Sequence, residues 1–230
     1  MTLTVVMANL KGGAGKTTIS LSLAVAAEEA GMRTVIIDVD PQQAAAKWGD
    51  LRTKTMARPP TVISAMASRL PQAFDSAQRV GAKMVLIETP AHAEGILISS
   101  IDASDLVLIP CRPTVLDLQH LAATVRLSDL RRRDHAVLLN AINARTIDRD
   151  QAKQAVAEMG INLIDAEISH LVAYARAPAA GQGATEFEPA GKAAAEMRRL
   201  VTELMGMYPS SMGSVDRHAP SHGVYQPVAV

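Results

Sequence analysis

The sequence predicts an α/β protein in which a twisted, mostly parallel β-sheet is covered by helices on both faces. Short runs rich in Val, Ile and Leu alternate with longer stretches of helical periodicity, which is the pattern of successive β-α-β units. The runs are apolar at nearly every position, so each strand is expected to be buried on both faces. The 230 residues suffice for one domain of this kind and are few for two.

Val, Ile and Leu dominate the expected strands. These are Leu3–Ala8, Thr34–Ile37, Met84–Ile87, Leu106–Ile109, Val137–Ala141 and Leu163–Ala166. The first helix is expected to end at Gly31 and to face the sheet with one apolar stripe, formed by Ile19, Leu23, Ala27 and Ala30. The last helix is expected to close the domain with the stripe Ala193, Met197, Leu200, Val201 and Leu204.

Residues 1–208 form the predicted domain, and residues 209–230, rich in Pro, Ser, Gly and His without periodicity, are expected to be a flexible tail. Basic and acidic residues number 23 each, so DNA binding would need a local patch. The single cysteine, Cys111, excludes an intrachain disulfide or a cluster site and is expected to be a small buried hydrophobe. No run approaches the ~20 apolar residues of a membrane span, and we expect a cytoplasmic protein without membrane contact.

A glycine-rich loop follows the first strand. The run Lys11-Gly12-Gly13-Ala14-Gly15-Lys16-Thr17-Thr18 has the glycines that let backbone N–H groups touch phosphate, and a helix follows it directly. Lys16 is expected to reach the β- and γ-phosphates of a nucleotide, and the Thr17 hydroxyl to bind Mg²⁺. The usual pattern asks for a glycine where this chain has Leu10, followed by the additional lysine Lys11. These features predict a P-loop fold that binds ATP and Mg²⁺.

Two carboxylates end the second strand, at the edge of a parallel sheet where ligands bind. Asp38 and Asp40 stand two residues apart, before Pro41 and Gln42, and therefore point to the same side. One acid could hold the water shell of the metal while the other orients the attacking water. The alternative is an Asp-Pro turn that caps the next helix.

A third acid, Glu88, ends the apolar strand Met84–Ile87, in the form of a Walker B strand. Because glutamate reaches about 1.5 Å further than aspartate, Glu88 could contact Mg²⁺ through water, accept a hydrogen bond from Thr17, or weaken the metal site. The following loop, 91–95, could respond to the γ-phosphate, and His92 within it is either solvated or functional.

These motifs, in their order and spacing, resemble the ParA family of partition ATPases, in the group that includes MinD and the nitrogenase iron protein. The resemblance runs from Thr4 to about Leu204. Its further segments are Ile109–Asp117 with the pattern I-P-C-R-P-T-x-x-D, Leu138–Asn140, and the stretch from Ala173 through Gly181 to Glu188. It implies a short form of the family without an N-terminal helix-turn-helix domain.

The resemblance also implies roles for individual residues. Lys11 would be the signature lysine that crosses a dimer interface to the phosphates of the second subunit; the alternative is a surface lysine paired with a nearby carboxylate. Asp40 would position the hydrolytic water, and Asp38 would be an outer partner of Mg²⁺. Asn140 would read the adenine edge through its amide, or would cap the end of its strand.

The function implied by the resemblance is an ATP-dependent dimerising switch with slow, partner-stimulated ATP hydrolysis. The ATP-bound homodimer would bind DNA without sequence preference and associate with the bacterial nucleoid. A partner of ParB type, or a small adaptor, would trigger release. The switch would partition plasmid or chromosomal DNA, or position another cargo.

Basic residues in the C-terminal half are the candidates for DNA contact, since phosphate contacts suffice for binding of this kind. The main candidates are Arg131, Arg132, Arg133, Arg176, Arg198 and Arg199, followed by Arg126, Arg145, Arg149 and Lys192. The alternative for Arg131–Arg133 is that they stabilise the C-terminal end of a helix. Many family members carry a Gln-Arg pair where this chain has His170-Leu171, so one such arginine is missing.

Two other functions are compatible with these sequence motifs. A metabolic ATP-dependent ligase or amidase could use the same scaffold, but it would give Lys11 no obvious role. A MinD-like positioning ATPase would need a basic amphipathic helix at its C-terminus, which the segment after Pro209 lacks.

Overall fold

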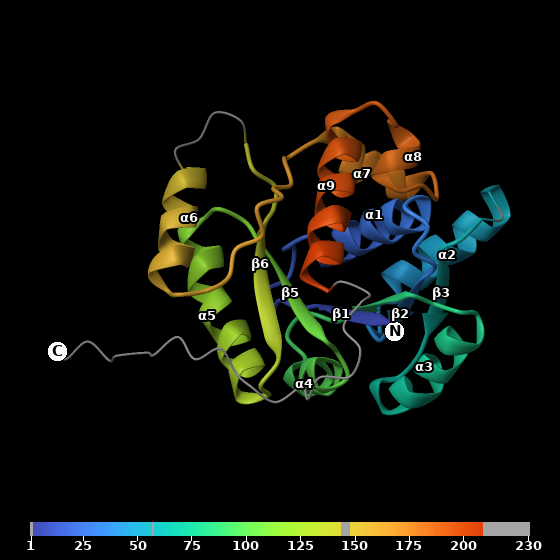
Figure 1. Ribbon diagram of the computed structural model, residues 1–230, viewed down its shortest axis with the longest axis horizontal. Helices are drawn as coiled ribbons and strands as arrows, with labels where there is room; N and C mark the ends of the chain where they lie inside the picture. The colour runs from blue at the N-terminus through green and yellow to red at the C-terminus, as the bar shows by residue number, and fades with distance from the viewer. Residues whose placement is uncertain (1, 57, 144–147, 209–230) are drawn as a thin grey trace.

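Strand β1 (Leu3–Met7) lies in the interior of a six-stranded sheet of order β3-β2-β4-β1-β5-β6. In this computed structural model, which describes residues 2–56, 58–143 and 148–208, every paired strand is parallel to its neighbour (Figure 1). The other strands are β2 (Thr34–Asp38), β3 (Thr61–Ser64), β4 (Met84–Glu88), β5 (Leu106–Cys111) and β6 (Asp134–Leu139). The predicted α/β class and parallel sheet are confirmed.

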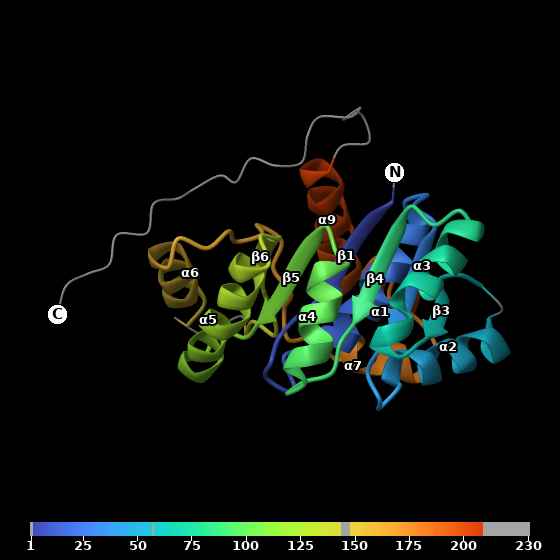
Figure 2. The ribbon, with the colours of Figure 1, turned by 90° about the horizontal axis from the view of Figure 1, so that it is seen from below.

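Helices cover both faces of the sheet. One face carries α1 (Lys16–Glu29), α7 (Val172–Ala179), α8 (Ala184–Phe187), α9 (Lys192–Met207) and the apolar side of α2 (Ala44–Thr55). The other carries α3 (Leu70–Arg79), α4 (Glu94–Asp102), α5 (Val115–Leu130) and α6 (Asp148–Glu158). In Figure 2, α3, α4 and α5 lie in front of the strands, with α1 and α9 behind. The strands are therefore buried on both faces, as their continuous apolar runs predict.

Helix α1 is buried on more sides than its sequence pattern predicts. Residues 19–27 are all buried, because α7, α8 and α9 cover the side of α1 that faces away from the sheet. Only Ala30, expected on the buried stripe, is exposed. Gly31 ends the helix with a φ of 80°, a left-handed conformation that glycine adopts without strain. The predicted apolar stripe of α9 is entirely buried.

The expected strand Leu163–Ala166 is not formed. The chain there forms isolated bridges, Val137 of β6 with Leu163 and Ile142, beyond β6, with Ser169, in place of a continuous ladder. The N–H groups of Ala166 and Ser169 donate instead to carboxylates of α9, those of Glu203 and Glu196. An N–H group that donates to a side chain does not donate to a neighbouring strand, so residues 163–166 form no regular strand.

The sequence pattern also misses β3, a short strand at the edge of the sheet. Its end residues Thr61 and Ser64 are exposed, so it lacks the apolar run that marks the inner strands. No helix among the described residues is long and apolar enough to cross a bilayer. The predicted tail, 209–230, lies outside the described residues.

Helix α2 is fastened to the turn before α8 by a buried arginine. The Arg52 guanidinium donates to both carboxylate oxygens of Glu186 at 2.7 Å and to the carbonyls of Gly181 and Pro59. Glu186 in turn accepts from the Gly183 N–H at 3.1 Å. A Cβ on Gly183 would lie 2.6 Å from Val25, so only glycine lets this turn pack against α1. The Gly181–Glu188 part of the family-like C-terminal stretch is thus an anchor between α1 and α2.

Candidate nucleotide site

The glycine-rich loop connects β1 to the N-terminus of α1. Gly15 is the residue before the helix and has a φ of 91°, and Gly13 has a φ of 75°. Such conformations favour glycine and leave the backbone N–H groups of the loop accessible. The first turn of α1 adds its own unpaired N–H groups and the positive end of the helix dipole. The loop therefore combines two left-handed glycines with a helix N-terminus, and its binding of phosphate stays a prediction.

Lys16 is nearly buried at the centre of the loop, and its ammonium donates to the carbonyl of Asn9 at 3.0 Å. Burial lowers the pKa of Lys16, and the nearby carboxylates of Glu88 and Asp40 oppose that shift. One cation and two acids therefore lie together at the carboxyl ends of β1, β2 and β4. This is the charge arrangement expected around a Mg²⁺-bound triphosphate.

Parallel pairing brings the acids together. Met7 pairs with Glu88 and Asp38 pairs with Glu88, so the ends of β1, β4 and β2 are level. The Thr17 hydroxyl donates to Oε1 of Glu88. Of the three behaviours considered for this glutamate, direct contact with Thr17 is the one observed.

The residues present fit a magnesium ion. Glu88 is fully buried, and its Oε2 has no hydrogen-bond partner among the described residues. Burial raises the pKa of Glu88 to about 8 despite the Thr17 hydroxyl and Lys16, which act in the opposite direction. A divalent cation would compensate this charge and use the free oxygen. No group of three or more His, Cys, Asp and Glu suited to a metal occurs in the described ranges.

Asp38 and Asp40 have different environments. Both oxygens of Asp38 accept backbone N–H groups, from Asp40 at 3.0 Å and from Ala46 at 2.9 Å, so Asp38 caps α2. Burial raises its pKa in spite of these bonds. Asp40 is half-buried and accepts from the Gln42 N–H through Oδ1 alone. The turn expected at Asp40-Pro41 is therefore present, with the Asp40 side chain accepting from Gln42, while the bond to the first turn of α2 comes from Asp38. Asp40 keeps its second carboxylate oxygen beside Lys16 and Glu88.

Two asparagines brace the loop. The Asn140 amide donates to the carbonyl of Ala14 at 2.7 Å, and a Cβ on Gly15 would lie 2.2 Å from its nitrogen. Asn140 therefore supports the loop, and its contact with adenine stays a prediction. Asn9, not singled out by the sequence analysis, donates to Pro110 of β5 and accepts from the Lys11 N–H, each at 2.8 Å. Its position directly after β1 was the available signal.

Lys11 forms an ion pair within its own chain. Its ammonium lies 2.9 Å from Oδ2 of Asp117, in the first turn of α5, and the two side chains are 29% and 5% exposed. Thr114 caps this helix and donates its hydroxyl to the same oxygen. The alternative of a paired surface lysine is therefore realised in this structure. The pattern Thr114-x-x-Asp117 is a helix-start signature that could have drawn attention to the aspartate.

Cys111 ends β5 beneath this ion pair and is buried, as expected. Burial, followed by the nearby Asp117 carboxylate, raises the pKa of its thiol to about 12. The side chain is thus a neutral thiol that fills space in the core.

Several of the basic residues proposed for DNA contact bond to other groups of the chain. Arg131 forms two hydrogen bonds to Asp102. Arg133 donates to the Asp102 carbonyl, Arg198 lies 3.9 Å from Glu29, and Arg199 pairs with Glu203. Arg149 pairs with Glu167 and Lys192 with Glu196, and Arg145 lies outside the described residues. Of the arginines proposed for DNA contact, Arg126, Arg132 and Arg176 are exposed and have no polar side-chain partner among the described residues.

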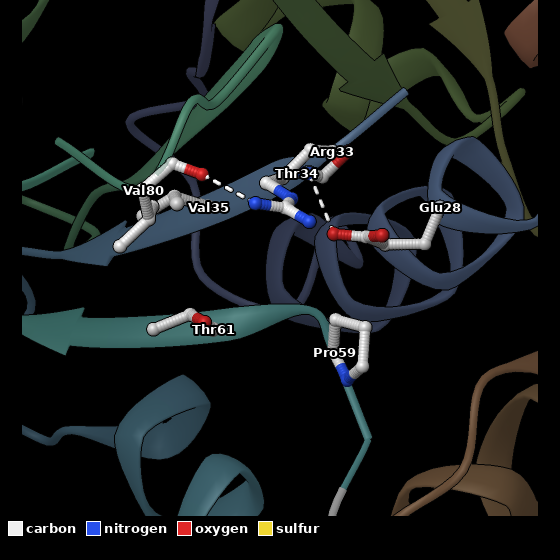
Figure 3. A pocket seen from close by; sticks show the side chains of 7 residues that line it. All are labelled: Glu28, Arg33, Thr34, Val35, Pro59, Thr61 and Val80. Carbon is white, nitrogen blue, oxygen red and sulfur yellow. Dashed lines mark hydrogen bonds between the residues drawn. The ribbon is translucent and has the colours of Figure 1, made fainter. Parts of the chain in front are cut away.

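A cavity of about 160 Å³ lies away from the loop, beside the first residues of β2 (Figure 3). Its polar groups satisfy one another: Arg33 donates to the Val80 carbonyl at 2.8 Å, and Glu28 accepts from the Thr34 N–H at 2.7 Å. Thr34 begins β2 and Asp38 ends it, so the cavity and the phosphate loop are at opposite ends of the strand. The nucleotide site is therefore assigned to the loop.

Comparison with known proteins agrees with this assignment. Residues 5–184 match the family model described as "CobQ/CobB/MinD/ParA nucleotide binding domain". Maintenance of carboxysome distribution protein A of Gloeobacter kilaueensis is 30% identical over 208 residues, covering 87% of this chain and 93% of that protein. The chromosome-partitioning ATPase Soj of Thermus thermophilus is 24% identical, covering 87% and 94%.

The fold is also found in solved structures. The septum site-determining protein MinD of Pyrococcus horikoshii, complexed with Mg-ADP, superposes with a TM-score of 0.71 at 19% identity, covering 90% of this chain and 97% of MinD. The family model spans most of the chain, and it includes the loop, both acid-bearing strands and Asp117. The chain therefore belongs to the CobQ/CobB/MinD/ParA nucleotide-binding family, as a P-loop ATPase of its ParA/MinD group.

Proposed function

We propose that this chain is an ATP-dependent dimerising switch that positions a cargo or partitions DNA through slow, Mg²⁺-dependent ATP hydrolysis. Relatives named for carboxysome distribution and for chromosome partitioning support a positioning function. The family description also includes CobQ and CobB, so membership alone does not separate a positioning ATPase from a metabolic ligase or amidase. The position of Lys11 favours the first.

The observation that carries the proposal is the separation of the two loop lysines. Lys16 is buried in the loop, where it serves the phosphates of its own chain. Lys11 lies at the loop entrance, is partly exposed, and is held by Asp117. A second ammonium beside the same phosphates would be repelled by Lys16 unless additional negative charge were present. An interface that brings two nucleotides together supplies that charge, and it gives Lys11 a partner in the second subunit.

Each residue of the site has a role in this mechanism. The loop N–H groups and Lys16 bind the phosphates, and Thr17 and Glu88 would hold Mg²⁺. When bound, the metal neutralises charge on the β- and γ-phosphates. Asp40 accepts from the Gln42 N–H through one oxygen, and the other is available to orient the hydrolytic water. Asp38 holds the start of α2, and with it the segment that carries Asp40.

Output of the switch is proposed to be nonspecific DNA binding by the ATP dimer, with nucleoid association and release stimulated by a ParB-type or small adaptor partner. Arg126, Arg132 and Arg176 are the best supported contacts, since their guanidinium groups are exposed and unpaired within the described residues. Dimerisation would double this set. Binding of this kind should need ATP and fall steeply as salt is raised.

Sedimentation with Mg²⁺ and ATP tests the switch. Lys16→Ala should abolish ATP binding, whereas Lys11→Ala should still bind ATP but remain monomeric. Lys54→Ala, which removes an exposed lysine of α2, is the control and should dimerise like the unaltered chain. Normal dimerisation of Lys11→Ala would reject the role of Lys11 across the interface. A metabolic ligase on this scaffold would show no nucleotide-dependent dimer that requires Lys11.

A further inference from the structure

We propose that His92 binds the terminal phosphate of ATP, from the loop between β4 and α4 of the same chain. The proposal rests on the nucleotide site described above and adds a nitrogen ligand to it. His92 would make the site respond to the phosphate that distinguishes ATP from ADP.

The loop that contains His92 lies against the phosphate loop. The imidazole Nε2 is 3.9 Å from the position that a Cβ on Gly12 would occupy, and the Ala91 Cβ is equally close to it. The His92 N–H donates to the carbonyl of Leu10 at 3.2 Å, at the entrance of the phosphate loop. The backbone of this one residue therefore bonds to Leu10, and its ring lies beside Gly12 in the same short segment.

His92 adopts a conformation that is unusual for a residue with a side chain. Its φ is 58°, in the left-handed region, and Ala93 follows as the residue before α4. Histidine is among the non-glycine residues that enter this region more often than most, at a cost of about 1 kcal/mol. A glycine here would be free of that strain, yet the chain carries an imidazole.

The ring is available for a ligand. His92 is exposed, and no polar partner of its side chain occurs among the described residues. Imidazole N–H groups donate to phosphate oxygens in either charge state. Glu88, at the end of β4, would face a Mg²⁺ ion that compensates the charge of the terminal phosphates, and the loop that follows Glu88 would then lie toward the γ-phosphate. The phosphates nearer the nucleoside would lie at the start of α1.

Nucleotide binding by the full chain tests this assignment. His92→Asn and His92→Gly both accept a positive φ, and both remove the ring. Affinity for Mg²⁺ with a slowly hydrolysed ATP analogue, and separately with ADP, is measured by calorimetry at concentrations where sedimentation shows a monomer. His120→Asn, which alters an exposed histidine of α5, is the matched control.

Both His92 variants should bind the ATP analogue about 10-fold more weakly and ADP within about twofold of the unaltered chain, as for the loss of one hydrogen bond to a charged group. Equal weakening for both nucleotides would reject the assignment, since it would mean that His92 only supports the loop. An unchanged affinity for the ATP analogue would reject it as well. If the unaltered chain bound neither nucleotide, the proposed function would fail together with it, and this outcome is distinguishable from the first two.

Discussion

Replacing Asp117 by asparagine should strengthen the ATP-dependent dimer. Asparagine has nearly the same shape and can still accept the hydrogen bond from the Thr114 hydroxyl at the start of α5, but it removes the charge that holds Lys11 within its own chain. If Lys11 must leave Asp117 to reach the nucleotide of the second subunit, the ion pair opposes dimerisation. The variant releases that restraint.

The expected size follows from burial of the pair. Exposed ion pairs contribute about 0–1 kcal/mol, whereas breaking buried ones costs about 3–5 kcal/mol. Asp117 is 5% exposed and Lys11 is 29% exposed, so the pair lies between these limits and nearer the lower one, because water reaches the ammonium. Taking about 1 kcal/mol per chain, a homodimer breaks two such pairs, which amounts to about 2 kcal/mol and a dimer Kd about 30-fold lower.

Sedimentation velocity over a protein concentration series, with Mg²⁺ and a slowly hydrolysed ATP analogue, gives the dimer Kd. Asp129→Asn, which alters an exposed acid of the same helix, is the control. Adding Lys11→Ala to Asp117→Asn should remove the gain, as a double-mutant cycle requires. A dimer that is weaker than that of the unaltered chain would refute the reasoning, since Lys11 would then keep Asp117 as its partner in the dimer.

The remaining predictions concern the acids and the glycines of the loop. Asp40→Ala should trap an ATP-bound dimer, and phosphate release should fall about 100-fold or more; a native rate would mean that another group positions the water. Glu88→Asp withdraws the carboxylate from Thr17 by about 1.5 Å. This variant should need a lower Mg²⁺ concentration for half-maximal hydrolysis, and slower hydrolysis that needs a higher Mg²⁺ concentration would contradict this. Gly15→Ala should destabilise the nucleotide-free chain by about 2–3 kcal/mol in urea unfolding, because it clashes with Asn140, whereas Gly13→Ala, with open space around it, should cost about 1 kcal/mol. Equal losses for the two glycines would argue against the clash.

Features that depend on a short continuous segment could be predicted from the sequence. The phosphate loop is a continuous segment, and two of its glycines, Gly13 and Gly15, have the left-handed conformation that favours glycine. The closeness of Asp38 and Glu88 was expected, because strands that run parallel end at one edge of the sheet. These inferences needed local sequence and one rule about sheets.

Contacts that depend on the order of strands could not be predicted. β1 lies beside β5, which brings Asp117 to Lys11 and Asn9 to Pro110, and β6 beside β5 brings Asn140 to the loop. A chain read alone does not specify which strands are neighbours. The strand expected at Leu163–Ala166 failed for a related reason, since the carboxylates of α9 that compete for its backbone are distant in sequence.

The fastening of α2 by Arg52 has a mechanical consequence. Hydrogen bonds hold α2 at both ends: Asp38 accepts from its first turn, and Arg52, near its end, donates to Glu186. Between Asp40 and the helix there is only the turn Pro41–Gln43, where Gln43 has a φ of 55°. A displacement of Asp40 is therefore absorbed in that turn or transmitted by α2, as a rigid helix, to Gly181, in the turn between α7 and α8, and to Glu186 of α8. Asp40, the proposed hydrolytic acid, is therefore connected through α2 to the turn that follows α7, the helix that carries the exposed Arg176.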